Sequence, residues 1–226
     1  MKKVILSAVA VWALVALIGC NHRTEVETVQ PDLAELKPMQ QSWRGVLPCA
    51  DCEGIETSLF LEKDGSWVMN SHYLGAAERN SVFATYGTWA RTADKLVLTD
   101  TQGEKYYYHA KGEALEMLDR DGNPITSQFN YTLEPVTASL PATPMAMRGM
   151  YQVVAGHATF TDCATEKTVR MRSVVPETGN RGEDKPVLLL MDGHFSLKTD
   201  PETREPVKVL TPDSKTTFVP GKGCKE

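Results

Sequence analysis

The sequence predicts an all-β protein built from two small antiparallel barrels. After residue 40 the chain divides into short strand-like runs separated by turns, many of which contain glycine. No helical periodicity of ten or more residues interrupts these runs. Between residues 134 and 144 the composition becomes rich in Pro, Thr and Ala and almost free of charge, which is typical of a domain linker. We therefore expect one domain at 42–134, a linker at 135–144 and a second domain at 145–226.

The first domain has the regular strand spacing of an antiparallel meander. Asp64-Gly65 separates the runs at 57–62 and 67–73, and this dipeptide between two strand-like runs is a strong hairpin signal. Further strand-like runs follow, and the turns between the later ones all contain glycine: 83–91, 95–99, 105–110, 114–118 and 128–133. Short strands joined by tight turns predict a small closed barrel.

The second domain shows a similar pattern of short strands. Asp192-Gly193 predicts another hairpin, and a polar loop covers residues 173–185. The strand-like runs are 148–154, 158–163, 168–172, 187–192, 194–198 and 207–210. Five or six strands in about 80 residues favour a small Greek-key barrel of the OB type.

The N-terminus has the organisation of a lipoprotein signal peptide. Two lysines precede an apolar run, Val4 to Ile18, which is too short for a comfortable membrane span and is typical of a secretory signal. The run ends in Leu-Ile-Gly-Cys, which resembles the lipobox of bacterial lipoproteins. That resemblance implies removal of residues 1–19 and acylation of Cys20, palmitate included, and more than one acyl chain gives stable membrane anchoring. In enteric bacteria an aspartate after the lipid site retains a lipoprotein in the inner membrane, so Asn21 predicts the outer membrane.

The mature chain is acidic and begins with a polar tether. Loss of the two signal-peptide lysines changes the net charge from −5 to −7, which argues against a nucleic-acid partner. Residues 20–41 are polar with two prolines, and about twenty such residues span up to about 65 Å when extended. The folded domains therefore need not lie against the membrane that anchors them.

The sequence carries no recognisable catalytic motif. It lacks a phosphate-binding glycine loop, a His-Glu-x-x-His zinc motif and a Gly-x-Ser-x-Gly elbow, and its five histidines are scattered singly. We therefore expect a protein that is not an enzyme and that needs no cofactor.

Four cysteines remain after lipidation of Cys20, and four cysteines allow three disulfide pairings. An exported protein reaches an oxidising compartment, where disulfides form. The domain boundaries select Cys49–Cys52 in the first domain and Cys163–Cys224 in the second. Closing the long loop contributes about 4 kcal/mol, against about 2 kcal/mol for the short one.

The pair in Leu-Pro-Cys-Ala-Asp-Cys-Glu-Gly, Cys49 and Cys52, has three possible uses. A thiol redox centre needs a helix N-terminus, which this turn between strands does not offer. Two reduced thiolates suit Cu(I), with Met39 or His72 as a third ligand. A local disulfide is the third possibility. The methionine-rich stretch at 145–150 is another copper candidate, although such residues are more often core.

Several motifs resemble one family closely: the lipobox, SWRGVLPCADCEGIETSLFLEKDG at 42–65, YGTWARTADKLVLTD at 86–100, MRGMY at 147–151 and ATFTDCAT at 158–165. Together they are similar to the NlpE (CutF) copper-homeostasis lipoproteins of enteric bacteria. The resemblance covers essentially the whole chain and all five cysteines, and residues 167–184 match the family pattern least. It implies a lipocalin-like N-terminal barrel and an OB-like C-terminal domain.

The resemblance also implies a function in envelope stress signalling. Members of the family activate the Cpx pathway through the inner-membrane sensor kinase CpxA, and copper tolerance and surface contact are associated with them. We expect the N-terminal domain to contact the kinase and a periplasmic disulfide oxidase to form the bridges. Failed disulfide formation at Cys163–Cys224, or inner-membrane retention after failed sorting, would then act as signals. The alternative is a binding module that holds copper or another small ligand.

Overall fold

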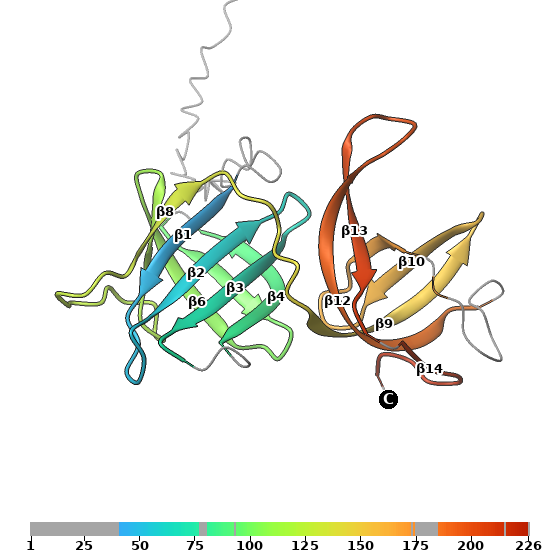
Figure 1. Cartoon of the computed structure of the whole chain (residues 1–226), viewed down its shortest axis with the longest axis horizontal. Coiled ribbons are helices and arrows are strands. Elements are labelled where there is room, and N and C mark those ends of the chain that lie inside the picture. Colours follow the sequence, from blue (N-terminus) through green and yellow to red (C-terminus); the bar gives the residue numbers. More distant parts are fainter. Residues whose placement is uncertain are drawn as a thin grey trace, which may run out of the picture. The chain divides into compact units, whose positions relative to one another are not determined.

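The computed structural model describes residues 41–76, 81–92, 94–172, 174, 185–214 and 216–225. These residues form two successive all-β domains (Figure 1). The predicted signal peptide, Cys20, Asn21 and Met39 lie outside the described residues, and so does most of the polar loop at 173–185. Among the described residues there is no helix long and apolar enough to cross a bilayer.

The N-terminal domain is a closed eight-stranded barrel in which each strand pairs with its neighbours in sequence. Antiparallel pairing of Ser42 with Val136 and of Arg44 with Glu134 closes the barrel between its first and last strands. The strands are β1 (Ser42–Leu47), β2 (Gly54–Leu61), β3 (Ser66–Leu74), β4 (Val82–Arg91), β5 (Leu96–Asp100), β6 (Lys105–Lys111), β7 (Ala114–Met117) and β8 (Thr132–Val136). The predicted meander and barrel are confirmed for this domain.

The two-residue alternation of the strands separates the inside of this barrel from its outside. Leu59 and Leu61 of β2 and Trp67 and Met69 of β3 point into the barrel and belong to its interior core. The Trp67 indole is fully buried and donates hydrogen bonds to the carbonyl oxygens of Thr88 and Thr99, at 3.0 and 3.2 Å. The residues between these positions point outward, and this distinction decides which side chains can meet a partner.

The C-terminal domain is a five-stranded barrel with one additional strand. Its strands are β9 (Met145–Val154), β10 (His157–Asp162), β11 (Thr168–Met171), β12 (Val187–Thr199) and β13 (Pro206–Pro212), and β14 (Thr217–Val219) pairs with β12. The order β13-β11-β10-β9-β12 closes through a further β13–β12 pairing. β11 and β13 run parallel, whereas the other pairs are antiparallel. The Greek-key barrel of OB type is therefore confirmed.

The hairpin predicted at Asp192-Gly193 is wrong, because β12 runs without a break from Val187 to Thr199. Gly193 lies inside this strand and pairs with Met145 on one side and Pro212 on the other. A Cβ atom there would lie 2.9 Å from the carbonyl oxygen of Thr211. This glycine allows a close backbone approach inside a sheet instead of forming a turn.

The turn that the sequence placed at residue 193 occurs after Asp200, between β12 and β13. The Asp200 carboxylate accepts hydrogen bonds from the backbone amides of Glu202 and Thr203 and contacts the Arg170 guanidinium. These donors, the two amides first, lower the pKa of Asp200 to about 2. Two further differences from the sequence prediction concern short strands: β8 covers residues 132–136 instead of the predicted 128–133 and so enters the range expected for the linker, and the short β14 was not predicted.

Candidate functional site: two disulfides and the contact between the barrels

Cys49 and Cys52 are joined by a disulfide in the turn between β1 and β2, with 5.3 Å between their Cα atoms. Both cysteines are partly exposed, and the two residues between them are exposed. The pair follows one antiparallel strand and precedes another, so it has no helix dipole to lower a thiol pKa. This geometry supports a local staple and does not support a thioredoxin-like centre.

A metal site at this turn would need reduced cysteines and further ligands. In the structure the two sulfurs are bonded to each other. His72, one of the suggested third ligands, has its Nδ1 atom 3.7 Å from the Glu56 carboxylate on the neighbouring strand. Within the described ranges no three His, Cys, Asp or Glu side chains are grouped as metal ligands. Copper binding by the reduced pair stays a prediction.

The methionine-rich stretch forms part of β9 and contributes mainly to packing. Met145 and Met147 are each 4% exposed and belong to a hydrophobic core, whereas Met150 is partly exposed. Core packing explains the place of Met145 and Met147 in an apolar cluster without a metal.

A cavity lies at the other end of the N-terminal barrel from the Cys49–Cys52 turn. Its volume is about 390 Å³, and Trp43, Trp89, Leu61 and Leu115 are among its lining residues. Both indoles are held by hydrogen bonds, from Trp43 to the Glu113 carbonyl and from Trp89 to the Glu62 carbonyl. This cavity is a candidate site for the small ligand of the alternative function.

Cys163 and Cys224 form the second disulfide, which spans 61 positions of sequence. It joins the residue after β10 to the C-terminal tail of the domain. A hydrogen-bonded group surrounds it: the Cys163 amide donates to the Arg148 carbonyl at 2.9 Å, and the Arg148 guanidinium donates to the Gly223 carbonyl at 2.8 Å. The bridge and Arg148 together fix the tail against β9 and β10.

Asp162, the residue before Cys163, connects this bridge to the N-terminal barrel. One carboxylate oxygen accepts from the amides of Ala164 and Thr165 and from the Thr165 hydroxyl. The other accepts a buried hydrogen bond from the Tyr86 hydroxyl of β4, at 2.7 Å. Burial, followed by the charge of Asp162, raises the pKa of Tyr86 well above its usual range, so the hydroxyl remains a donor.

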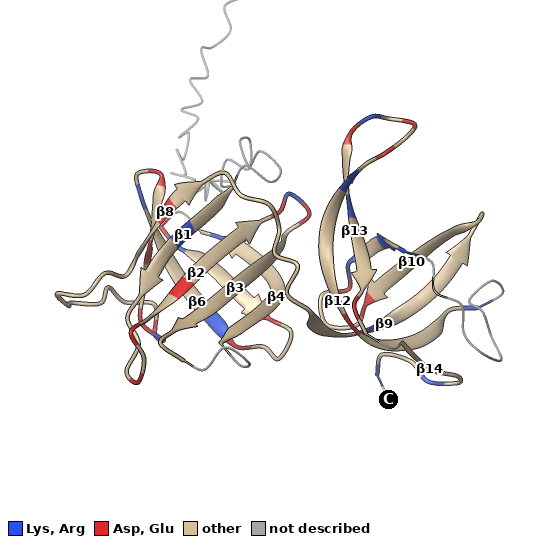
Figure 2. Cartoon of the chain, viewed as in Figure 1, with Lys and Arg blue, Asp and Glu red and all other residues tan. Residues whose placement is uncertain are grey.

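A second polar contact between the barrels centres on Lys208 of β13. Its ammonium group lies 2.9 Å from Glu62 and 2.7 Å from Asp64, both in the β2–β3 turn, and donates to the Ser66 hydroxyl at 2.8 Å. The charged tip of this turn is visible in Figure 2. The same ammonium group lies 5.0 Å from the centre of the Phe195 ring, within the range of a cation–π contact.

The two carboxylates that share Lys208 respond oppositely to their surroundings. Burial raises the pKa of Glu62, and the opposing effect of Lys208 does not offset it. Burial also acts to raise the pKa of Asp64, but Lys208 and the Ser66 donors outweigh it and leave that pKa lowered. Glu62 is the more deeply buried of the two, and its Oε1 atom has no hydrogen-bond partner among the described residues. Glu62 therefore depends strongly on a single cation.

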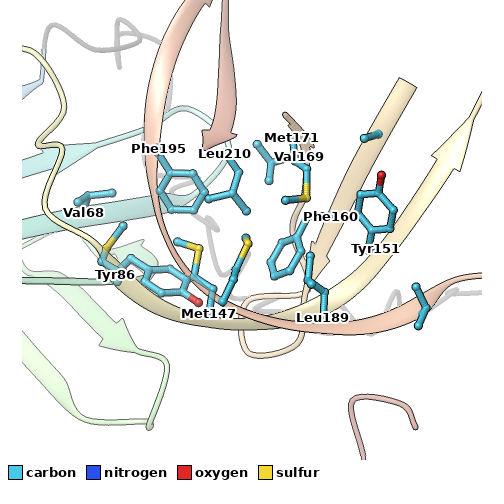
Figure 3. Packing of buried hydrophobic residues seen from close by; sticks show 14 of the residues in the cluster. Val68, Tyr86, Met147, Tyr151, Phe160, Val169, Met171, Leu189, Phe195 and Leu210 are labelled. Carbon is cyan, nitrogen blue, oxygen red and sulfur yellow. The ribbon is translucent and has the colours of Figure 1, made fainter. Parts of the chain in front are cut away.

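Between these polar contacts the barrels, which belong to one compact unit, share a hydrophobic cluster. Phe60, Val68 and Tyr86 from the outer face of the N-terminal barrel belong to one cluster with core residues of the C-terminal domain such as Met147 and Phe195. Figure 3 shows Val68 and Tyr86 beside Met147 and Phe195. The rings of Tyr86 and Phe195 meet edge to face, with 5.8 Å between their centroids. The structure therefore places the contact between the barrels directly beside the long-range disulfide.

Few features of the sequence predict this contact between the barrels. Asp162 lies within ATFTDCAT, one of the motifs that carries the family resemblance, but its bond to Tyr86 joins positions 76 residues apart. In the sequence, nothing distinguishes Lys208 and Glu62 from ordinary surface charges. An apolar outward position in a predicted amphipathic strand, such as Phe60 or Val68, was the one available signal.

Comparison with known proteins agrees with this two-domain organisation. Residues 43–128 match the family model of the NlpE N-terminal domain, and residues 141–225 match that of the NlpE C-terminal OB domain. Lipoprotein NlpE of Escherichia coli strain K12 is 62% identical over 231 residues, which cover 99% of this chain and 97% of that protein.

Two solved structures are also similar. The crystal structure of the Cpx pathway activator NlpE from Escherichia coli is 61% identical and covers 83% of this chain and all of that one, with a TM-score of 0.37. A putative lipoprotein from Shewanella oneidensis is 34% identical over 44% of this chain and 91% of its own, also with a TM-score of 0.37. The two family models cover both barrels, and the Escherichia coli relative matches nearly end to end. This chain therefore belongs to the NlpE lipoprotein family.

Proposed function

We propose that this chain is an outer-membrane lipoprotein that reports envelope stress to the Cpx two-component pathway through the inner-membrane sensor kinase CpxA. Its similarity to a protein described as a Cpx pathway activator supports the pathway. The lipobox and Asn21 support the location. Failed lipoprotein sorting and failed disulfide formation are the two principal signals, and copper and surface contact act as further stresses.

The observation that carries the redox part is the direct sequence link between the long-range disulfide and the barrel contact. Cys163 is bonded to Cys224, and its neighbour Asp162 accepts the buried hydrogen bond from Tyr86. A periplasmic disulfide oxidase makes the bridge in unstressed cells. When the bridge is missing, the tail is no longer fixed and the turn that orients Asp162 loosens. The N-terminal barrel is then released to contact the kinase.

Replacing Cys163 with alanine should raise Cpx output in oxidising cells, because the variant imitates a failed bridge. A Cpx-dependent reporter measures the output at matched protein levels. The control is Cys49→Ala in the other disulfide, which closes a short loop far from Asp162 in sequence and should change the output much less. Unchanged reporter activity in the Cys163→Ala strain would contradict the redox part of the proposal.

Replacing Asn21 with aspartate tests the sorting part. By the rule for enteric lipoproteins this change retains the protein in the inner membrane, beside the kinase, and output should rise although both disulfides can form. Membrane fractionation followed by reporter assay measures both consequences, with Asn21→Gln as a control that keeps the residue uncharged. Retention in the inner membrane without a rise in output would contradict this part.

A further inference from the structure

The outer face of β2, β3 and β4 has an unusual composition for the outside of a barrel. Phe60, Val68 and Tyr86 alternate with inward residues and therefore point away from the barrel interior. They are nonetheless only 3%, 1% and 6% exposed, because the C-terminal domain covers them. Antiparallel strands that face water normally carry polar residues on that side. We call Phe60, Val68 and Tyr86, together with Glu62 and Asp64 at the adjoining turn, the covered face.

The C-terminal domain shows what chemistry the covered face accepts. Its apolar part receives Met147 and the Phe195 ring, and its acidic edge receives the Lys208 ammonium group. The ammonium group lies near the same aromatic ring. A complementary surface therefore combines one cation with an aromatic or aliphatic patch beside it.

The contact between the C-terminal domain and the covered face has features that favour its release. Glu62 is buried, and one of its oxygens has no hydrogen-bond partner in the part of the chain that the structure describes, which opposes a tight contact. Among the described residues, Lys208 is the cation that forms ion pairs with both Glu62 and Asp64, so loss of this one side chain weakens the acidic edge. The other polar contact, the Tyr86 to Asp162 bond, depends on the turn beside Cys163. Loosening of the disulfide therefore acts directly on the cover.

We propose that the covered face is the surface with which the N-terminal barrel binds the periplasmic sensor domain of its kinase, and that the C-terminal domain competes with the kinase for it. This inference rests on the proposed function and adds the surface to it. The partner it requires is a protein domain that presents a lysine or arginine beside an apolar patch, as Lys208 and Phe195 do here. An isolated N-terminal barrel would expose three large apolar side chains, which explains why the resting protein keeps them covered.

Paired substitutions in the full chain test the surface. In the Cys163→Ala background, Val68→Glu places a charge in the covered face and should return Cpx output to the uninduced level. Val97→Glu is the matched control, because Val97 points outward from β5, between the buried Leu96 and Leu98. It should leave the raised output unchanged. Tryptophan fluorescence checks that the N-terminal barrel is folded in both double variants, since Trp43, Trp67 and Trp89 all lie in this domain. Equal output from the two double variants overturns the proposal.

A photo-reactive residue gives a second, direct readout. Position 63 lies exposed at the β2–β3 turn, at the edge of the covered face, and position 113 lies exposed at the β6–β7 turn. In the Cys163→Ala strain, cross-links to the kinase should form from position 63 and not from position 113. Cross-links from position 113 alone, or none from position 63 while output is high, overturn the proposal.

The two proposals fail in different ways. If Cys163→Ala leaves output unchanged, the redox part of the proposed function fails, and the surface is decided in a Lys208→Met strain with the disulfide intact. In that strain, only the Lys208 contact of the C-terminal domain with the covered face is lost. Kinase cross-links from position 63 in that strain support the surface, and their absence overturns it. Lys198→Met, which removes an exposed lysine of β12, is the matched control and should give none.

Discussion

Replacing Lys208 with methionine is expected to weaken the contact between the barrels by about 3 kcal/mol, the lower end of the cost of breaking a buried ion pair. Glu62, only 8% exposed at its side chain, would lose its cation. Protonation of the Glu62 carboxylate would reduce this destabilisation, since burial already raises its pKa. Asp64 is 40% exposed and can be solvated by water, so it adds little.

Urea unfolding followed by tryptophan fluorescence measures this effect, because the three tryptophans of the mature chain report on the N-terminal barrel. The midpoint should fall in the Lys208→Met variant. Adding Glu62→Gln should restore most of the loss, because an uncharged amide no longer leaves a buried charge without a partner. A double variant as unstable as the single one would show that packing of the Lys208 stem, and not charge, holds the contact.

The contribution of Glu62 to the free energy of unfolding should become less favourable as the pH rises. The pKa of Glu62 in the folded protein lies above its ordinary value of 4.5, so the folded state binds the proton more tightly than the unfolded state. The unfavourable contribution of Glu62 is therefore absent below pH 4.5 and grows as the pH rises through the raised pKa. Without Lys208 the decline should be larger in total and continue to higher pH, because the Lys208 charge no longer opposes the effect of burial on the pKa of Glu62. The difference between wild type and Lys208→Met should shrink on acidification.

The strand pattern made the fold predictable because periodicity and turn residues are local properties of a sequence. The Asp64-Gly65 hairpin and the closed meander follow from such signals. The prediction of a hairpin at Asp192-Gly193 was wrong for the same reason. In the local sequence, a glycine that permits the close approach of Thr211 cannot be distinguished from a glycine in a turn. Only the pairing partners, which are distant in sequence, distinguish the two uses.

The candidate site was less predictable because its contacts join the two domains. The disulfide partners Cys163 and Cys224 followed from counting cysteines within domain boundaries. The role of Asp162 did not follow, because it depends on Tyr86, and no rule of spacing relates the outer face of one barrel to a turn of another. Outward apolar residues indicate that a face is covered, but the sequence does not say by what.

Loss of the Cys163–Cys224 bridge is expected to have the other large effect. Replacing both cysteines with alanine should lower the stability of the C-terminal barrel by about 4 kcal/mol, because the unfolded chain regains the freedom of a loop of about 60 residues. The equivalent Cys49→Ala and Cys52→Ala variant should lose about 2 kcal/mol from the N-terminal barrel. Circular dichroism in urea follows both barrels, and tryptophan fluorescence follows the N-terminal one separately. Equal losses in the two variants would contradict the loop-length argument.

For the proposed function, the size of this effect favours the long bridge over the Cys49–Cys52 turn as the redox-sensitive element. A small domain is stable by about 5–10 kcal/mol, so a loss of about 4 kcal/mol is a large share of the total. The same loss raises the unfolded or loosened fraction by about three orders of magnitude. The turn beside the bridge orients Asp162, so that change in population acts on the Tyr86 hydrogen bond and on the cover of the N-terminal barrel. Hydrogen exchange of the amides of Ala164 and Thr165 should therefore accelerate when the bridge is removed, while that of Leu98 in the N-terminal core should change much less.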